Sequence, residues 1–70
     1  MEPSPSRKFI DERLGGTGQV ARAVGRGPNA VRMWIHRRRI PRAVWPDILK
    51  AYPKVKLDEL RAVEAAERAA

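Results

Sequence analysis

The apolar residues of two neighbouring segments repeat at the spacing of a single helix face. They are Val20, Ala21 and Val24 in the first segment, and Ala30, Val31, Trp34 and Ile35 in the second. Residues at i, i+1, i+4 and i+5 lie on one side of an α-helix, whereas the residues of a half-buried strand would alternate. Two short helices, each with one buried face, are therefore predicted.

The residues between these segments are those of a tight turn. Gly25 follows the last apolar residue of the first segment, where glycine adopts a left-handed backbone conformation without a Cβ clash. Gly27 is a suitable N-cap, and Pro28 suits the first position of a helix because no amide donor is needed there. The sequence therefore predicts a helix-turn-helix in residues 17–36, with its second helix at about residues 28–37.

The second helix carries a different set of side chains opposite its apolar face. Asn29, Arg32, Met33 and His36 fall at i, i+3, i+4 and i+7, so they are expected to point outward together. Arginine can pair with guanine and asparagine with adenine, and an apolar tip such as that of methionine can contact the thymine methyl group. This face is therefore a candidate reader of DNA bases. Exposure without any contact is the alternative for His36.

Four positions in this stretch match a known motif. A small residue, a glycine, an aliphatic residue and a large apolar residue stand at set offsets, here Ala21, Gly25, Val31 and Trp34. On these residues the chain resembles the helix-turn-helix of Cro/CI-type (XRE-like) phage and mobile-element repressors, closely over residues 17–36 and more loosely as far as residue 60. Two residues depart from that pattern. Arg26 stands where the family usually has an aliphatic residue, and Gly27 stands where it usually has a Ser or Thr cap.

The resemblance implies an all-α, lambda-repressor-like domain of four to five short helices. It also implies a repressor that binds double-stranded DNA through the major groove, close to its own gene, and blocks the polymerase. One recognition helix reads only a few base pairs, so a homodimer on a palindromic operator is expected. In this family the residues that match Thr17 and Gln19 contact the DNA backbone, and a simple helix cap is the alternative for Thr17.

Charge along the chain is strongly uneven. The net charge is +7, and the eight arginines from Arg13 to Pro46 stand without any Asp, Glu or Lys among them. A block of one sign suits a polyanion, and the planar fork of arginine binds phosphate oxygens. Besides Thr17 and Gln19, the candidate phosphate contacts are Arg26, Arg37, Arg38, Arg39 and Arg42. A basic face that serves only solubility is the alternative.

The flanking segments complete one small domain, residues 6–53. Residues 1–5 are expected to be a disordered tail, and residues 6–14 a first helix with Ser6 as its N-cap. A fourth helix is expected to begin at Pro46, because the residue before a proline disfavours the α conformation.

Residues 54–70 are predicted to form a C-terminal helix, with a short strand at KVKL as an alternative for its start. The apolar residues of this segment step by three: Leu57, Leu60, Val63 and Ala66. Such a stripe can dock on the domain or form a dimer contact, and the sequence leaves both open.

Missing residue types argue against several classes of protein. There is no cysteine and only one histidine, so neither a disulfide framework nor a metal site is expected. No base stands beside a nucleophile, so we expect no catalytic residues, no cofactor and no small-molecule substrate.

No stretch is apolar enough for a membrane span or a signal peptide, so a cytoplasmic location without membrane contact is expected. An alternative function is that of an antitoxin, or another protein-interaction module, that retains a DNA-binding helix-turn-helix.

Overall fold

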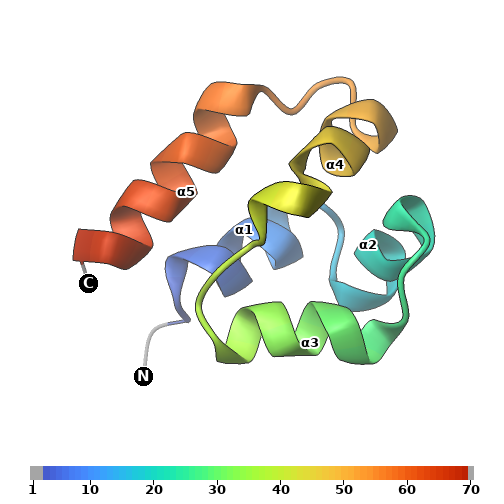
Figure 1. Ribbon diagram of the computed structural model, residues 1–70, viewed down its shortest axis with the longest axis horizontal. Coiled ribbons are helices and arrows are strands. Elements are labelled where there is room, and N and C mark those ends of the chain that lie inside the picture. Colours follow the sequence, from blue (N-terminus) through green and yellow to red (C-terminus); the bar gives the residue numbers. More distant parts are fainter. Residues whose placement is uncertain (1–2, 70) are drawn as a thin grey trace.

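The computed structural model describes residues 3–69, and the regular structure in this range is entirely helical (Figure 1). The α-helices are α1 (Pro5–Glu12), α2 (Thr17–Val24), α3 (Pro28–His36), α4 (Trp45–Ala51) and α5 (Leu57–Ala69), and a short 3-10 helix, η1 (Arg42–Val44), precedes α4. The prediction of an all-α domain with short helices is therefore confirmed. The KVKL segment forms no strand in the described part of the chain, so that alternative is wrong.

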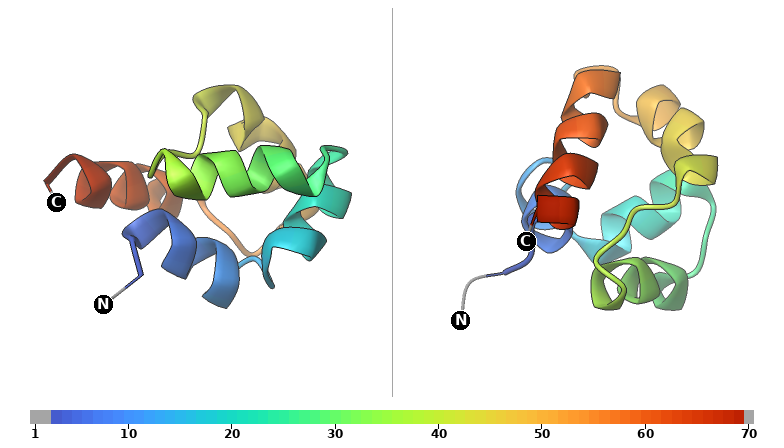
Figure 2. Two further views of the ribbon diagram at one scale, coloured as in Figure 1. Left: turned by 90° about the horizontal axis from the view of Figure 1, so that it is seen from below. Right: turned by 60° about the vertical axis from the view of Figure 1, so that its left-hand side comes forward.

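Helix α1 lies at the centre of the molecule and packs against α2, α3 and α5. Helix α4 contacts α2 on one side and α5 on the other. Figure 1 and the left view of Figure 2 both show α5 and α2 at opposite ends of the molecule, with α1 between them. The pair formed by α2 and α3 is therefore not covered by the C-terminal helix.

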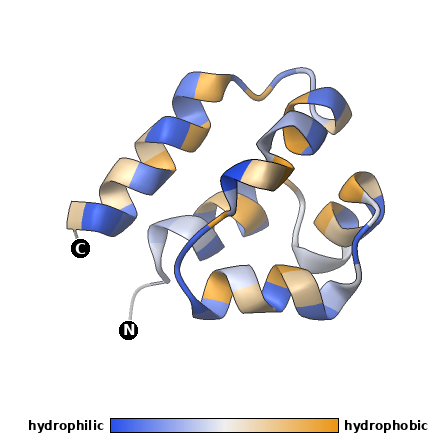
Figure 3. Cartoon of the chain, in the orientation of Figure 1, coloured by the Kyte–Doolittle hydropathy of each residue, from blue (hydrophilic) through white to orange (hydrophobic). Residues whose placement is uncertain are grey.

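The hydrophobic core lies where the inner faces of these helices meet. Figure 3 shows the apolar residues that each helix contributes along its length. Its buried members are Phe9, Ile10, Leu14, Val20, Ala21, Val24, Val31, Trp34, Ile40, Val44, Trp45, Ile48, Val55 and Leu60. The three apolar residues predicted for the inner face of α2 are all among them. On α3, Val31 and Trp34 are buried, and Ala30 and Ile35 pack against the core while partly buried.

The start of α1 differs from the prediction. Its N-cap is Ser4 rather than Ser6, and the Ser4 Oγ accepts a hydrogen bond of 3.3 Å from the Arg7 N–H. Pro5 belongs to the helix and not to a tail. Of the other predicted tail positions, Pro3 lies before the helix without regular structure, and Met1 and Glu2 lie outside the described residues. Ser6 is completely buried under α5, a long-range contact that no local cap signal reveals.

Two further helix starts also differ from expectation. Thr17 is the first helical residue of α2, and the N-cap is Gly16, which has no side chain to bond the first amides. Helix α4 begins at Trp45 rather than Pro46, directly after η1. Trp45 is helical (φ −58°, ψ −45°) although proline follows, because its ring is buried and its Nε1–H donates to the Ile40 carbonyl at 3.1 Å.

Helix α5 docks on α1, so the structure shows docking for the C-terminal helix. The predicted apolar stripe is only partly buried, since Leu60 is buried and Val63 half-buried, whereas Leu57 and Ala66 are exposed. Near the C-terminal end of the helix, the Glu67 Oε2 accepts the Ser6 N–H at 3.0 Å, which ties the end of α5 to the beginning of α1. A dimer contact through the exposed face of α5 stays a prediction.

Candidate nucleic-acid interface

Helices α2 and α3 are joined by the three residues 25–27, the connectivity of a helix-turn-helix. Gly25 is left-handed (φ 70°), its N–H donates to the Arg22 carbonyl at 3.4 Å, and the Arg26 N–H donates to the Ala21 carbonyl at 2.9 Å. Gly27 is extended and caps α3, with Pro28 in the first helical position. These turn predictions are confirmed, and the turn brings the inner face of α3 against α2.

The outer face of α3 is built as the helical spacing predicts. Val31 is fully buried and Trp34 is 8 % exposed, so these two side chains fix which way the helix faces. The four residues predicted to contact bases are all exposed: Asn29, Arg32, Met33 and His36. Met33 is 44 % exposed, so its apolar tip is open to an external contact. The structure therefore brings the candidate base-reading residues together on one solvent-facing surface.

Ion pairs divide the arginine block into two groups. Arg13 pairs with Glu59 and Arg42 pairs with Glu64, both on α5. The other six of the eight arginines form no ion pair with any residue in the range 3–69: Arg22, Arg26, Arg32, Arg37, Arg38 and Arg39. Four predicted phosphate contacts belong to this second group, and all of its members are exposed. Their cationic heads are therefore available to an external anion.

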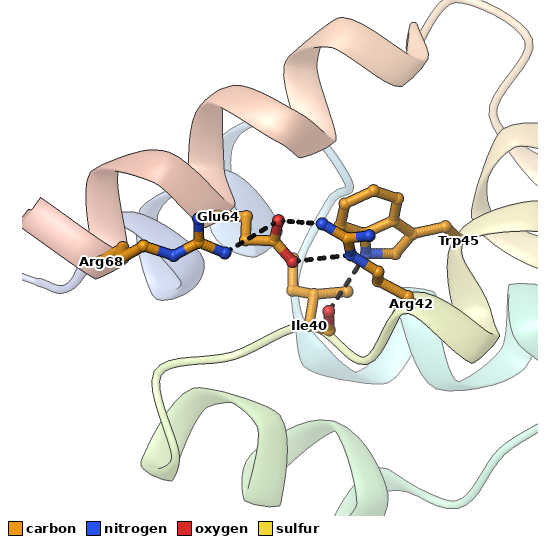
Figure 4. A network of polar contacts seen from close by, with 5 residues as sticks. All are labelled: Ile40, Arg42, Trp45, Glu64 and Arg68. Atoms are coloured by element: carbon orange, nitrogen blue, oxygen red, sulfur yellow. Dashed lines mark hydrogen bonds and ion pairs between the residues drawn. The ribbon is translucent and has the colours of Figure 1, made fainter.

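Arg42 has a different environment from the other predicted phosphate contacts (Figure 4). Its Nε donates to Glu64 Oε2 at 3.0 Å and its Nη2 to Glu64 Oε1 at 2.7 Å, while its guanidinium lies 5.3 Å from the centre of the Trp45 ring. The hydrogen bond from Arg42 lowers the pKa of Glu64. The structure thus uses Arg42 to hold α5 against η1. A phosphate contact of Arg42 stays a prediction, and it would use the N–H groups that Glu64 leaves free or compete with Glu64 for the others.

The pair of Arg13 and Glu59 was not predicted from the sequence. The Nε of Arg13 lies 2.8 Å from Glu59 Oε1, and this hydrogen bond is the main reason that the pKa of Glu59 is lowered. The two residues are 46 positions apart. No local spacing connects them, so only the docked position of α5 reveals that Arg13 is a structural cation.

The beginning of α2 carries the two polar residues predicted to contact the DNA backbone. Thr17 is half-buried and Gln19 is exposed, and no side chain caps the first amides of this helix. A Cβ at Gly15 would lie 2.9 Å from the Gln19 Oε1, so the glycine leaves room for that side chain beside the turn. Free amides and a dipole of positive sign at this end favour an anion.

The residues that follow α3 form a cationic corner. Arg37 is the C-cap, and the chain then reverses through Arg38, the one residue other than glycine in the described part of the chain with a positive φ (55°). Beside this corner, a hollow of about 480 Å³ runs along α3 and is lined by Ala30, Met33, Trp34, Arg37, Arg39 and Pro41. The lining of this hollow thus combines apolar residues, among them the exposed Met33, with two arginines.

Other kinds of site receive no support from the geometry. In the range 3–69, no three His, Asp or Glu side chains are grouped to hold a metal ion. Nor does the described part of the chain contain a helix with the length and apolar character needed to cross a membrane.

The candidate interface is therefore an exposed helix face, bordered by arginines that form no ion pair within residues 3–69, on a scaffold whose inner faces are buried. In comparisons with known proteins, no protein-family model, no curated protein and no solved structure matches the chain.

Proposed function

We propose that this protein is a sequence-specific double-stranded DNA-binding regulator, most simply a Cro-like repressor of a promoter near its own gene. The observation that carries the proposal is the outer face of α3. Hydrogen-bonding and apolar side chains that match base edges are exposed together there, and the helix is followed by arginines without an ion pair in the described part of the chain.

In the proposed complex, α3 lies in the major groove and its outer residues read bases. Arg32 pairs with a guanine, Asn29 with an adenine, and Met33 packs on a thymine methyl group. Arg26, Arg37 and Arg39 bind phosphates, together with Thr17 and Gln19 at the start of α2. Phosphate contacts fix the register of the helix without carrying sequence information, so the specificity comes from α3.

The length of α3 supports a dimeric form of binding. Its nine residues span roughly 13 Å, which corresponds to roughly four base pairs in the groove. Four base pairs occur too often in any genome to define one site, so two copies on a palindrome are needed for useful specificity. We therefore propose a homodimer that acts in the cytoplasm on chromosomal or mobile-element DNA and represses by occluding the promoter.

The test of this proposal is a selection of bound sequences from a random duplex pool, followed by anisotropy titrations of the selected duplex and a scrambled copy. Arg32→Ala is expected to reduce the discrimination between the two duplexes by about 1 to 3 kcal/mol. Arg22→Ala is the matched control, because Arg22 is also exposed and unpaired in the described structure but lies beside α4. That variant is expected to discriminate as the wild type does.

Two outcomes would count against this function. If Arg32→Ala discriminates like the wild type, Arg32 does not read a base. If the selection returns no preferred sequence and every duplex binds weakly with the same steep salt dependence, the arginines act alone. The C-terminal helix would then be examined as the binding surface for a protein partner, as in an antitoxin.

A further inference from the structure

The ends of α2 and α3 have the same backbone structure but different residues at the critical position. At the end of α2, the N–H groups of Gly25 and Arg26 donate back to the helix, to Arg22 and Ala21 respectively. At the end of α3, the Arg38 N–H donates to the Ile35 carbonyl at 3.1 Å, and the Arg39 N–H to the Trp34 carbonyl at 2.9 Å. Both helices therefore end in the same Schellman motif.

This motif requires a left-handed residue, which is Gly25 (φ 70°) in α2 and Arg38 (φ 55°) in α3. Glycine is the usual residue at such a position because every L-residue with a Cβ is strained there. The two helix ends can be compared directly, because α2 has a relaxed glycine at the left-handed position and α3 has a strained arginine there. The fold would gain stability from a glycine at position 38.

No direct polar contact within residues 3–69 explains an arginine at this position, although Arg38 shares the lining of a hollow with Glu64 and Glu67 of α5. The Arg38 side chain is exposed, and it forms no hydrogen bond or ion pair with the residues that the structure describes. The hydrogen bonds of the cap use only its backbone N–H. A cation near a helix C-terminus is favoured by the helix dipole, but Arg37 and Arg39 already supply that charge, and neither has a positive φ.

We infer that Arg38 is a positioning residue of the nucleic-acid interface, an anchor that binds a backbone phosphate at the end of α3. Strained residues in folded proteins concentrate at functional sites, where the side chain is needed in that place. Arg38 lies two residues after the exposed His36, at the end of the proposed reading face. A phosphate bound here fixes how far α3 extends along the groove. This inference rests on the proposed function and identifies which arginine fixes the register.

The decisive variant is Arg38→Gly, for which opposite effects on stability and on binding are expected. Removing the strain is expected to raise the melting temperature by roughly 5 °C. Losing one phosphate contact is expected to reduce the salt slope of binding by about 0.9, and the affinity for every duplex by roughly eightfold at 0.1 M salt. A residue with only a structural role would not move the salt slope.

Two further variants separate charge from strain. Arg38→Lys keeps both the cation and the strained backbone, so it is expected to melt like the wild type and to retain the salt slope. Gly25→Ala introduces the same strain at the matching position of α2, where an added Cβ meets nothing within 4 Å. It is expected to lower the melting temperature by about as much as Arg38→Gly raises it.

Each part of the inference has its own contrary result. Unchanged affinity and salt slope in a stabilised Arg38→Gly protein would overturn the phosphate role. A lower melting temperature for Arg38→Gly would overturn the premise that the position is strained. Wild-type protein that binds no duplex at any salt concentration would instead overturn the proposed function, whatever the melting temperatures of the variants.

Discussion

Two neighbouring residues on α3, Met33 and Trp34, provide the sharpest test of which way this helix faces. Trp34 is 8 % exposed in the core, and truncating a buried tryptophan to alanine costs about 3 to 5 kcal/mol. A domain of 70 residues has a free energy of unfolding of about 4 to 10 kcal/mol. Trp34→Ala is therefore expected to remove between about a third and all of this stability, and to lower the melting temperature by at least about 12 °C.

Met33→Ala is the matched substitution on the opposite face. Met33 is 44 % exposed, so its removal is expected to change the free energy of unfolding by no more than about 0.5 kcal/mol. Its proposed role is an apolar contact with a thymine methyl group, so the affinity for the selected duplex is expected to fall while the fold persists. Thermal unfolding followed by circular dichroism and anisotropy titration of the folded fraction measure the two effects separately.

The reasoning about the helix faces would be refuted by the reverse pattern. A Trp34→Ala protein that melts like the wild type and loses only DNA binding would place the tryptophan on the reading face. A Met33→Ala protein that unfolds would place the methionine in the core. Either result would also remove Arg32 and His36 from the proposed contact surface, because their positions are assigned by the same helical phase.

Two further predictions concern the contacts of α1 and α5. Ser4→Ala removes the cap of α1 and is expected to lower the free energy of unfolding by about 1 kcal/mol. Ser6→Ala removes a buried hydroxyl that has no partner in the described structure, so it is expected to be neutral or stabilising. Thermal melts that rank the two variants the other way would restore Ser6 as the cap. Arginine partners lower the pKa values of Glu59 and Glu64 below their ordinary value of 4.5, so the stability from these pairs is complete above that pH and is lost as the pH falls through the lowered values. Thermal melts between neutral and acidic pH are expected to show this loss of stability, and the loss is expected to be smaller in the double variant Glu59→Gln, Glu64→Gln. An equal loss of stability in the double variant would mean that other carboxylates cause it.

The helix-turn-helix could be predicted from the sequence because its signals are local. Gly25, Gly27 and Pro28 each satisfy a backbone requirement that depends on neighbouring residues alone, and the apolar spacing of α3 defines its buried face. Helix starts were less well predicted, because Ser4 and Ser6 are both suitable caps and the choice between them depends on which one α5 covers.

The distribution of free and paired arginines could not be predicted. Arg13 and Arg42 stand in the same uninterrupted basic block as Arg38, but their carboxylate partners come from a helix 46 and 22 residues away, respectively. Which cations a distant helix neutralises is a property of tertiary packing. The strain at Arg38 is equally hidden, since three consecutive arginines give no sign of which one adopts the left-handed conformation.

The docked position of α5 also has an electrical consequence. Its four carboxylates and two arginines give this helix a net charge of −2, while residues 13–46 carry the eight arginines and no carboxylate. Because α5 and α2 lie at opposite ends of the molecule, the domain has a permanent electric dipole moment (Figure 1). In the field of a polyanion this moment exerts a torque that turns the basic end forward before contact. A larger share of collisions then begins in a productive orientation, and this advantage shrinks as added salt shortens the range of the field.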